Sequence, residues 1–190
     1  MIDMFRPKIS RQAIDSVVDV LHSRWIGQGP KVDEFEHAFQ YAFNVKHAVA
    51  VNSGTSALET AYDILKLGPG DEVITTPLTC TATNLPLVRR GCKIIWADIN
   101  PKTLCIDPID VRGKCTDKTK AIIQVHLGGI KADVGIVHVP VVSDAAQALG
   151  VFNGDFTACS FQAIKHIATG DGGMLVCPSE VSAKKAKLFR

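Results

Sequence analysis

A lysine in a glycine-flanked loop is the residue of this sequence with the clearest chemical potential. Lys165 lies in the stretch SFQAIKHIATGDGGMLV at 160–176, between an apolar run that ends at Phe161 and one that begins at Met174. Residues 169–173 carry turn chemistry, because their glycines accept positive backbone angles. A desolvated lysine amine condenses with an aldehyde to form a Schiff base. The alternative is an ordinary surface-loop lysine, because lysine is rarely buried.

A second stretch has the composition of a phosphate-binding turn. The apolar run at 48–51 leads into Asn-Ser-Gly-Thr-Ser at 52–56 and then into a helical pattern at 57–66. The free amides and the dipole of a first helical turn attract an anion. Ordinary capping by Ser53 or Thr55 explains the same residues. The sequence has neither a Walker pattern nor Gly-x-Gly-x-x-Gly, which argues against nucleoside triphosphate and dinucleotide sites.

A carboxylate follows a further apolar run. Asp144 comes directly after Val-Pro-Val-Val-Ser at 139–143, and Gln147 lies three residues beyond it. A carboxylate at the end of a buried strand needs a cationic partner, and a protonated pyridine nitrogen would serve. Gln147 could reach a substituent of the same ring if a helix begins here. Capping of such a helix by Asp144 is the alternative, and both readings stay open at this point.

Composition excludes several functional classes. With 190 residues, 46% of them hydrophobic and 21% charged, the chain has globular proportions and room for one domain or slightly more. A net charge of +2 predicts no nucleic-acid partner. The 6 cysteines lack metal-site spacing and are scattered, as in cytoplasmic proteins. The first seven residues lack the apolar core of a signal peptide, and no apolar run is long enough for a membrane partner.

Short Val/Ile runs that alternate with helical patterns predict an α/β fold with a mostly parallel sheet covered on both faces. Ligands of such sheets bind beyond the carboxyl ends of the strands, where Ser53, Thr79, Asp144 and Lys165 would meet. The predicted helices are 10–22, 32–43, 57–66 and 79–88, and the predicted strands are 48–51, 72–77, 92–99, 121–126, 137–143, 157–161 and 173–177.

Several motifs together resemble the DegT/DnrJ/EryC1/StrS family of sugar aminotransferases. They occur in the family's order over nearly the whole chain: WIGQGP at 25–30, NSGTSAL at 52–58, GPGDEVI at 68–74, DAAQA at 144–148, SFQAIK at 160–165 and TGDGGM at 169–174. The resemblance implies fold type I of the enzymes that use pyridoxal 5'-phosphate. It also implies transfer of an amino group from an amino-acid donor, glutamate or glutamine, to the keto carbon of a nucleotide-linked sugar.

The resemblance also implies roles for single residues. Lys165 corresponds to the Schiff-base lysine and general base, Asp144 to the aspartate under the pyridine nitrogen, and Gln147 to the glutamine near the phenolic oxygen. Some relatives that dehydrate sugars have histidine at the lysine position, so Lys165 favours transamination. The residues that would hold the phosphate are Gly54, Thr55, Ser56 and Ser160.

The sequence departs from the family in three places. Cys80 stands where many members place an aromatic ring against the cofactor, so that stacking is lost or comes from elsewhere. The stretches 131–137 and 150–155 are short, which predicts the loss of a helix and of a hairpin. The chain stops at Arg190, where the family continues into a small C-terminal domain.

These departures leave two functional hypotheses. We expect an N-terminal helical segment at 1–45 and a pyridoxal-phosphate-binding large domain at 46–190, with the C-terminal small domain absent. The first hypothesis is a homodimeric aminotransferase, whole or as one part of a split enzyme with a separate C-terminal half. The second is a truncated, non-catalytic protein that binds pyridoxal phosphate or acts by association. Retention of the lysine, aspartate, glutamine and phosphate-loop set favours the first.

Overall fold

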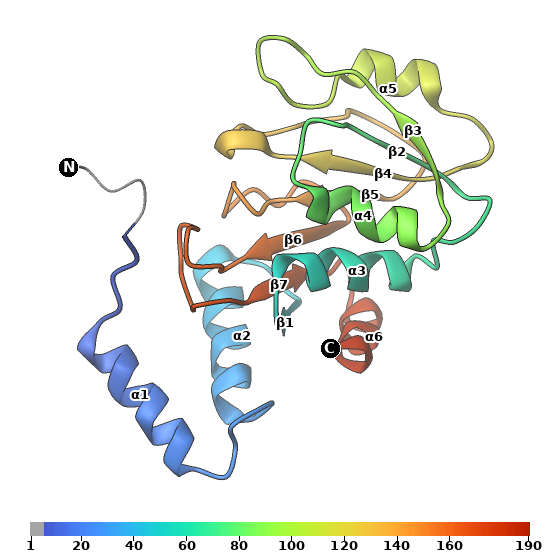
Figure 1. Cartoon of the computed structure of the whole chain (residues 1–190). Coiled ribbons are helices and arrows are strands. Elements are labelled where there is room, and N and C mark those ends of the chain that lie inside the picture. Colours follow the sequence, from blue (N-terminus) through green and yellow to red (C-terminus); the bar gives the residue numbers. More distant parts are fainter. Residues whose placement is uncertain (1–5) are drawn as a thin grey trace.

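Helices and strands alternate along residues 6–190, the part of the chain that the computed structural model describes (Figure 1). Residues 1–5 lie outside this range. They include most of the seven N-terminal residues for which the sequence predicted no signal peptide. The elements are α1 (Arg11–His22), α2 (Pro30–Phe43), β1 (Ala48–Val51), α3 (Gly54–Ile64), β2 (Glu72–Thr75), α4 (Thr81–Arg89), β3 (Lys93–Trp96), α5 (Pro108–Lys114), β4 (Thr119–Val125), the 3-10 turn η1 (Leu127–Gly129), β5 (Val141–Asp144), β6 (Phe156–Ser160), β7 (Gly173–Val176) and α6 (Glu180–Phe189).

All seven strands form one sheet in the order β1-β7-β6-β5-β4-β2-β3. Strand β7 is antiparallel to both of its neighbours, β1 and β6, and the other four pairs are parallel. The predicted mostly parallel seven-stranded sheet flanked by helices is therefore confirmed. Because β1, β2, β4, β5 and β6 run in the same direction, the loops that follow them meet at one edge of the sheet.

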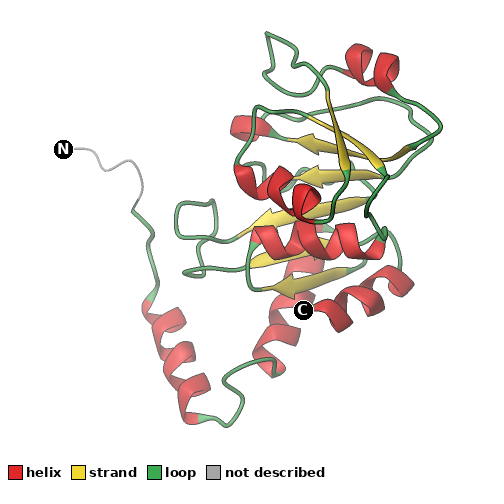
Figure 2. Cartoon of the chain, turned by 45° about the vertical axis from the view of Figure 1, so that its right-hand side comes forward, coloured by secondary structure: helices red, strands yellow, loops and turns green. Residues whose placement is uncertain are grey.

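Helices cover both faces of the sheet (Figure 2). Side chains of α3, α4 and α6 share one core with alternate residues of the central strands. On the opposite face, α5 packs with β2 and β4, and α2 packs with β1, β6 and β7. Adjacent residues of one strand point to opposite faces, so Ile122 and Ile123 of β4, both fully buried, belong to different cores.

An aromatic cluster joins α2 to the sheet. Phe35, Phe39 and Phe43 follow one another at helical spacing, and Phe152 and Phe161 pack against them from other segments. The ring centroids of Phe39 and Phe161 are 6.1 Å apart with an interplanar angle of 69°, an edge-to-face arrangement. The rings of Phe39 and Phe161 belong to the core on this face of the sheet, and the other three pack against it.

The structure shortens several predicted strands and adds two helices. The strand expected at 92–99 spans only Lys93–Trp96. The strand expected at 137–143 spans only Val141–Asp144, because Pro140 has no N–H to donate to a ladder. The polar stretch before β4 contains α5, which Asp107 caps and Pro108 begins. Helix α6 at the C-terminal end was not predicted. No helix occurs at 131–140, in agreement with the short stretch noted there.

Helix α1 stands apart from the sheet in both views (Figures 1 and 2). Its apolar side chains lie on one face, as predicted, but none of its residues is buried. Among residues 6–190, no helix is long and apolar enough to cross a membrane.

Truncation of the aromatic cluster tests whether it stabilises the fold. Phe39 is 3% exposed, and we expect Phe39→Ala to lower the free energy of unfolding by about 3–5 kcal/mol through lost burial and an unfilled cavity. The matched control is Tyr41→Ala on the same helix, because Tyr41 is 91% exposed and should change stability by no more than about 0.5 kcal/mol. Urea denaturation measures both. Equal effects of the two substitutions would contradict the role of the cluster.

Candidate functional site

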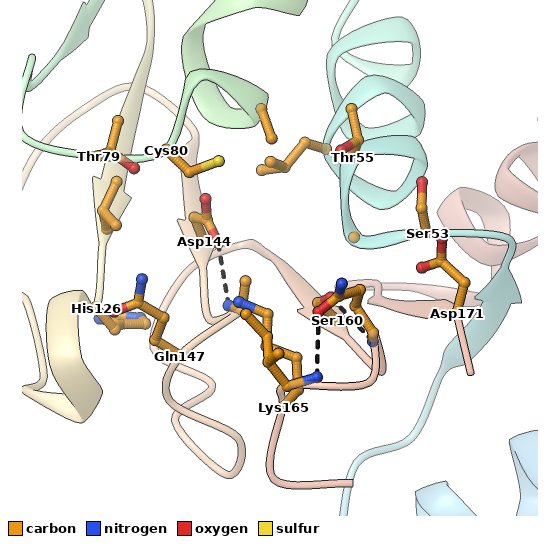
Figure 3. Close-up of a pocket in the computed structure, with 17 residues that line it drawn as sticks. Ser53, Thr55, Thr79, Cys80, His126, Asp144, Gln147, Ser160, Lys165 and Asp171 are labelled. Atoms are coloured by element: carbon orange, nitrogen blue, oxygen red, sulfur yellow. Dashed lines mark hydrogen bonds between the residues drawn. The ribbon is translucent and has the colours of Figure 1, made fainter. Parts of the chain in front are cut away.

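A cavity of about 330 Å³ opens at the sheet edge where the loops after β1, β2, β4, β5 and β6 meet (Figure 3). Its size lies within the range of small-molecule sites. The structure gathers there nearly all the residues that the sequence singled out, although they are far apart in the chain. These residues are Ser53, Gly54, Thr55, Thr79, Cys80, Asp144, Gln147, Ser160 and Lys165.

One side of the cavity is the start of α3. Ser53 caps the helix, and its Oγ accepts a hydrogen bond from the amide of Ser56 (3.0 Å). The helix leaves the amides of Gly54 and Thr55 without an acceptor of its own. Capping by Ser53 and a free anion-binding turn therefore coexist. Ser56 does not line the cavity: its amide and its hydroxyl both contact Ser53 Oγ.

Close backbone packing brings Ser160 to this side. A Cβ added to Gly54 would lie 2.9 Å from the Cβ of Ser160, so only glycine allows the start of α3 to lie against the end of β6. The hydroxyl of Ser160 thereby borders the same part of the cavity as the α3 amides (Figure 3).

Asp144 ends β5 inside the protein and is 6% exposed. Thr83 Oγ1 donates to its Oδ2 (2.7 Å) and the amide of Ala146 donates to its Oδ1 (3.0 Å). Because Thr83 uses its proton in this way, the hydroxyl of Thr79 donates to Thr83 Oγ1 (2.8 Å). Turns follow Asp144 rather than a helix, so Asp144 is not a helix cap and Gln147 is not on a helix.

The charge of Asp144 is poorly compensated by the protein. Burial raises the pKa of this carboxyl, and the hydrogen bonds from Thr83 and Ala146 and the charge of Lys165 only partly oppose that shift. Within residues 6–190, no cation lies at ion-pair distance from Asp144. A protonated ring nitrogen beside this carboxylate would supply the missing positive charge, so the site fits a pyridinium cofactor.

Lys165 lies in a structured loop between β6 and β7. Two backbone hydrogen bonds close the loop: Phe161 N–H donates to Gly172 O (2.8 Å) and Thr169 N–H donates to Phe161 O (2.9 Å). Phe161 is 1% exposed within the aromatic cluster, which fixes the loop's first residue. Lys165 is half-buried and lines the cavity, unlike an ordinary surface-loop lysine.

Cys80 occupies the opposite rim as the N-cap of α4, where its side chain makes no capping hydrogen bond. The thiol is exposed. No Phe, Tyr or Trp is among the described residues that line the cavity. Within residues 6–190, the cavity therefore offers no aromatic ring in place of Cys80.

Three residues of the site escaped sequence reasoning. Thr83 donates a hydrogen bond to Asp144. Asp171 lines the cavity near Ser53, and His126, the residue after β4, lies beside Gln147 (Figure 3). Burial and the charge of Lys131 lower the pKa of His126 to about 4, so its imidazole is neutral near pH 7. The one sequence signal for these three residues was their position near the carboxyl ends of predicted strands, where ligands of such sheets bind.

Comparisons with known proteins point to a family of aminotransferases. The DegT/DnrJ/EryC1/StrS aminotransferase family model matches residues 7–190. The spore coat polysaccharide biosynthesis protein SpsC of Bacillus subtilis is 40% identical over 96% of this chain and 51% of its own length. The enzymes of this family use pyridoxal 5'-phosphate, and solved relatives include pyridoxal-phosphate and pyridoxamine-phosphate forms.

Solved structures show the same fold. The Streptococcus pneumoniae protein Spr1654, in its pyridoxal-phosphate form, is 30% identical, with a TM-score of 0.89 over 98% of this chain and 57% of its own. PseC of Helicobacter pylori, an aminotransferase involved in the biosynthesis of pseudoaminic acid, is 31% identical, with a TM-score of 0.91 over 99% of this chain and 55% of its own. The chain thus spans about half the length of these relatives, and it belongs to the DegT/DnrJ/EryC1/StrS aminotransferase family.

Proposed function

We propose that this chain is the cofactor-binding part of a pyridoxal-phosphate-dependent sugar aminotransferase. One observation carries the proposal: Asp144, a buried carboxylate with no cation at ion-pair distance among residues 6–190, lines the same cavity as Lys165. A chain with no use for a cationic ring would gain stability by replacing such a carboxylate, because burying an uncompensated charge is costly. The family to which the chain belongs supports the same proposal.

Each side of the cavity then has one task. Lys165 Nζ would hold the cofactor through its aldehyde carbon, with loss of water, and as a free amine it would accept and return a proton at the substrate carbon. Asp144 would keep the ring nitrogen protonated, and Gln147 Nε2 would donate to the phenolic oxygen. When bound, pyridoxal phosphate supplies a ring that accepts the electron pair left by that proton. The phosphate would lie against the amides of Gly54 and Thr55.

Four further residues contribute, directly or indirectly, to the proposed phosphate and ring contacts. Hydroxyls of Ser53 and Ser160 face the phosphate side, and Ser56 acts indirectly by holding Ser53 Oγ. Cys80 would lie over the ring in place of an aromatic side chain, a contact with less surface to bury.

The substrates and assembly are proposed from the family. We infer that the amino group comes from glutamate or glutamine and passes to the keto carbon of a nucleotide-linked sugar. We further propose a cytoplasmic homodimer in which residues 46–190 form the cofactor-binding domain and 1–45 flank it. In relatives about twice as long, further residues are available to position the sugar.

Chemical trapping tests the cofactor assignment. After incubation with pyridoxal phosphate, reduction with sodium borohydride should attach the pyridoxyl group to Lys165, and peptide mapping should locate it there. Lys165→Ala should abolish the label, whereas the control Lys184→Ala, whose side chain is 74% exposed on α6, should retain it. Label on another lysine, or none with excess cofactor, would overturn the assignment.

Removal of the buried charge tests the role of Asp144. Asp144→Asn loses a charge-assisted contact, so we expect the dissociation constant of pyridoxal phosphate to rise roughly tenfold or more. In an assembly that transaminates, turnover should fall on the order of a hundredfold. The control is Asp171→Asn, an exposed carboxylate of the same cavity, for which absorbance titration should give a change below about fivefold. Similar constants for Asp144→Asn and wild type would refute the role.

The exposed apolar face of α1 predicts self-association. Ile14, Val17, Val18 and Leu21 are all at least 44% exposed, and such apolar patches favour association, most often as two-fold dimers. Light scattering at micromolar concentration should give a mass near twice the 20.5 kDa of one chain. A monomeric mass would contradict the proposed dimer.

A further inference from the structure

The amide group of Gln147 has a defined orientation. Its Oε1 accepts a hydrogen bond from the backbone N–H of Gly128 at 2.7 Å. A glutamine amide offers one oxygen acceptor and two N–H donors, so this bond commits the oxygen to the η1 loop. Among residues 6–190, Gln147 Nε2 has no acceptor, and the side chain lines the cavity (Figure 3). Gln147 therefore presents a hydrogen-bond donor, Nε2, to the cavity.

The conformation of the η1 loop aims the Gly128 N–H at Gln147. Gly128 has φ +61° and Gly129 has φ +86°, a left-handed pair that glycine adopts at little cost. The turn is closed by the hydrogen bond from Ile130 N–H to Leu127 O (3.0 Å). Nothing lies within 4 Å of a Cβ added to Gly128, so packing does not hold this residue in place.

His126 holds the two ends of the segment that contains this loop. Its backbone N–H donates to the carbonyl of Asp144 (3.0 Å), which fixes the entrance beside the buried carboxylate. Its ring Nδ1 accepts the backbone N–H of Ala132 (2.9 Å), which fixes the exit. The imidazole is 0% exposed. The carbonyl of Ala132 also accepts Asn153 Nδ2 (2.8 Å), so the exit is tied to a second loop.

We propose that His126 is a positioning residue: through its bond to Ala132 it holds residues 127–131 so that Gly128 fixes the amide of Gln147 with Nε2 toward the cavity. This inference rests on the proposed function, because the acceptor for Nε2 is the phenolic oxygen of the cofactor. The orientation of the Gln147 amide is important at this contact. A reversed amide would turn its own oxygen toward an anionic oxygen, an arrangement that is repulsive.

A structural role for His126 is the competing explanation, because buried polar atoms are usually hydrogen-bonded: Nδ1 accepts from Ala132, although Nε2 has no partner among the described residues. The two explanations differ in what happens to Gln147. If His126 only fills the interior, its replacement changes global stability and leaves the Gly128–Gln147 bond intact. If His126 positions Gln147, its replacement has the same local effect as removal of the Gln147 side chain.

The first measurement needs no cofactor. Amide hydrogen exchange of Gly128, followed by NMR on the chain itself, reports its bond to Gln147. We expect exchange to be roughly tenfold faster in Gln147→Ala, and similarly faster in His126→Phe, which keeps a ring but no acceptor for Ala132. His126→Asn, whose side-chain oxygen can accept from Ala132, should restore slow exchange. Wild-type exchange at Gly128 in His126→Phe would overturn the proposal.

The second measurement uses the absorbance of bound pyridoxal phosphate as a function of pH. A donor to the phenolic oxygen shifts the titration midpoint of this absorbance, so Gln147→Ala and His126→Phe should move it in the same direction. The double variant should match Gln147→Ala alone, because the histidine acts through the glutamine. Shifts that add in the double variant would overturn the proposal.

Two controls keep these outcomes distinct. If His126→Phe does not fold, Gly128→Ala replaces it: this exposed site has room for a methyl group, but the positive φ is unfavourable for alanine. It should speed exchange at residue 128 and shift the midpoint in the direction of Gln147→Ala, and the lack of both changes would refute the proposal. If wild type binds no cofactor, the proposed function fails, while the exchange measurement still decides the role of His126.

Discussion

Burial of the Asp144 carboxylate is the constraint on which the site depends. A charge taken out of water must be compensated. Residues 6–190 supply hydrogen bonds from Thr83 and the amide of Ala146 and the charge of Lys165, but no ion pair. The hydroxyl of Thr79 supports Thr83, and His126 bonds to the backbone carbonyl of the same aspartate. Segments from β2, β4 and β5 are thus ordered around one carboxylate. A cationic ring placed beside it completes the arrangement.

The site also requires a rigid support for the loop between β6 and β7 that carries Lys165. The loop leaves β6 at Phe161, whose ring packs against α2, and returns through the antiparallel strand β7. A hairpin anchored by a buried aromatic residue loses less conformational freedom when it binds a ligand than a free loop does. Helix α2 lies on the sheet face opposite α3, so both faces contribute to one cavity at the sheet edge.

Sequence reasoning succeeded where the signal is local. The turn at 52–56 and the loop around Lys165 carry their own glycines and hydroxyls, and the structure brings both to the cavity. It failed at the start of β5, because valines before Pro140 look like a strand although proline interrupts the ladder. It also missed α5, despite the capping signal of Asp107 before Pro108.

By itself the sequence determined the parallel α/β architecture and most of the polar residues of the site, because strand ends and turns have a short-range chemical pattern. Only the tertiary structure decided how those residues are held. Thr83 meets Asp144 across 61 positions of the chain, and Gly128 meets Gln147 across 19. Such contacts arise from strand order and loop closure, which no local pattern encodes. They stabilise the buried carboxylate of Asp144 and fix the orientation of Gln147.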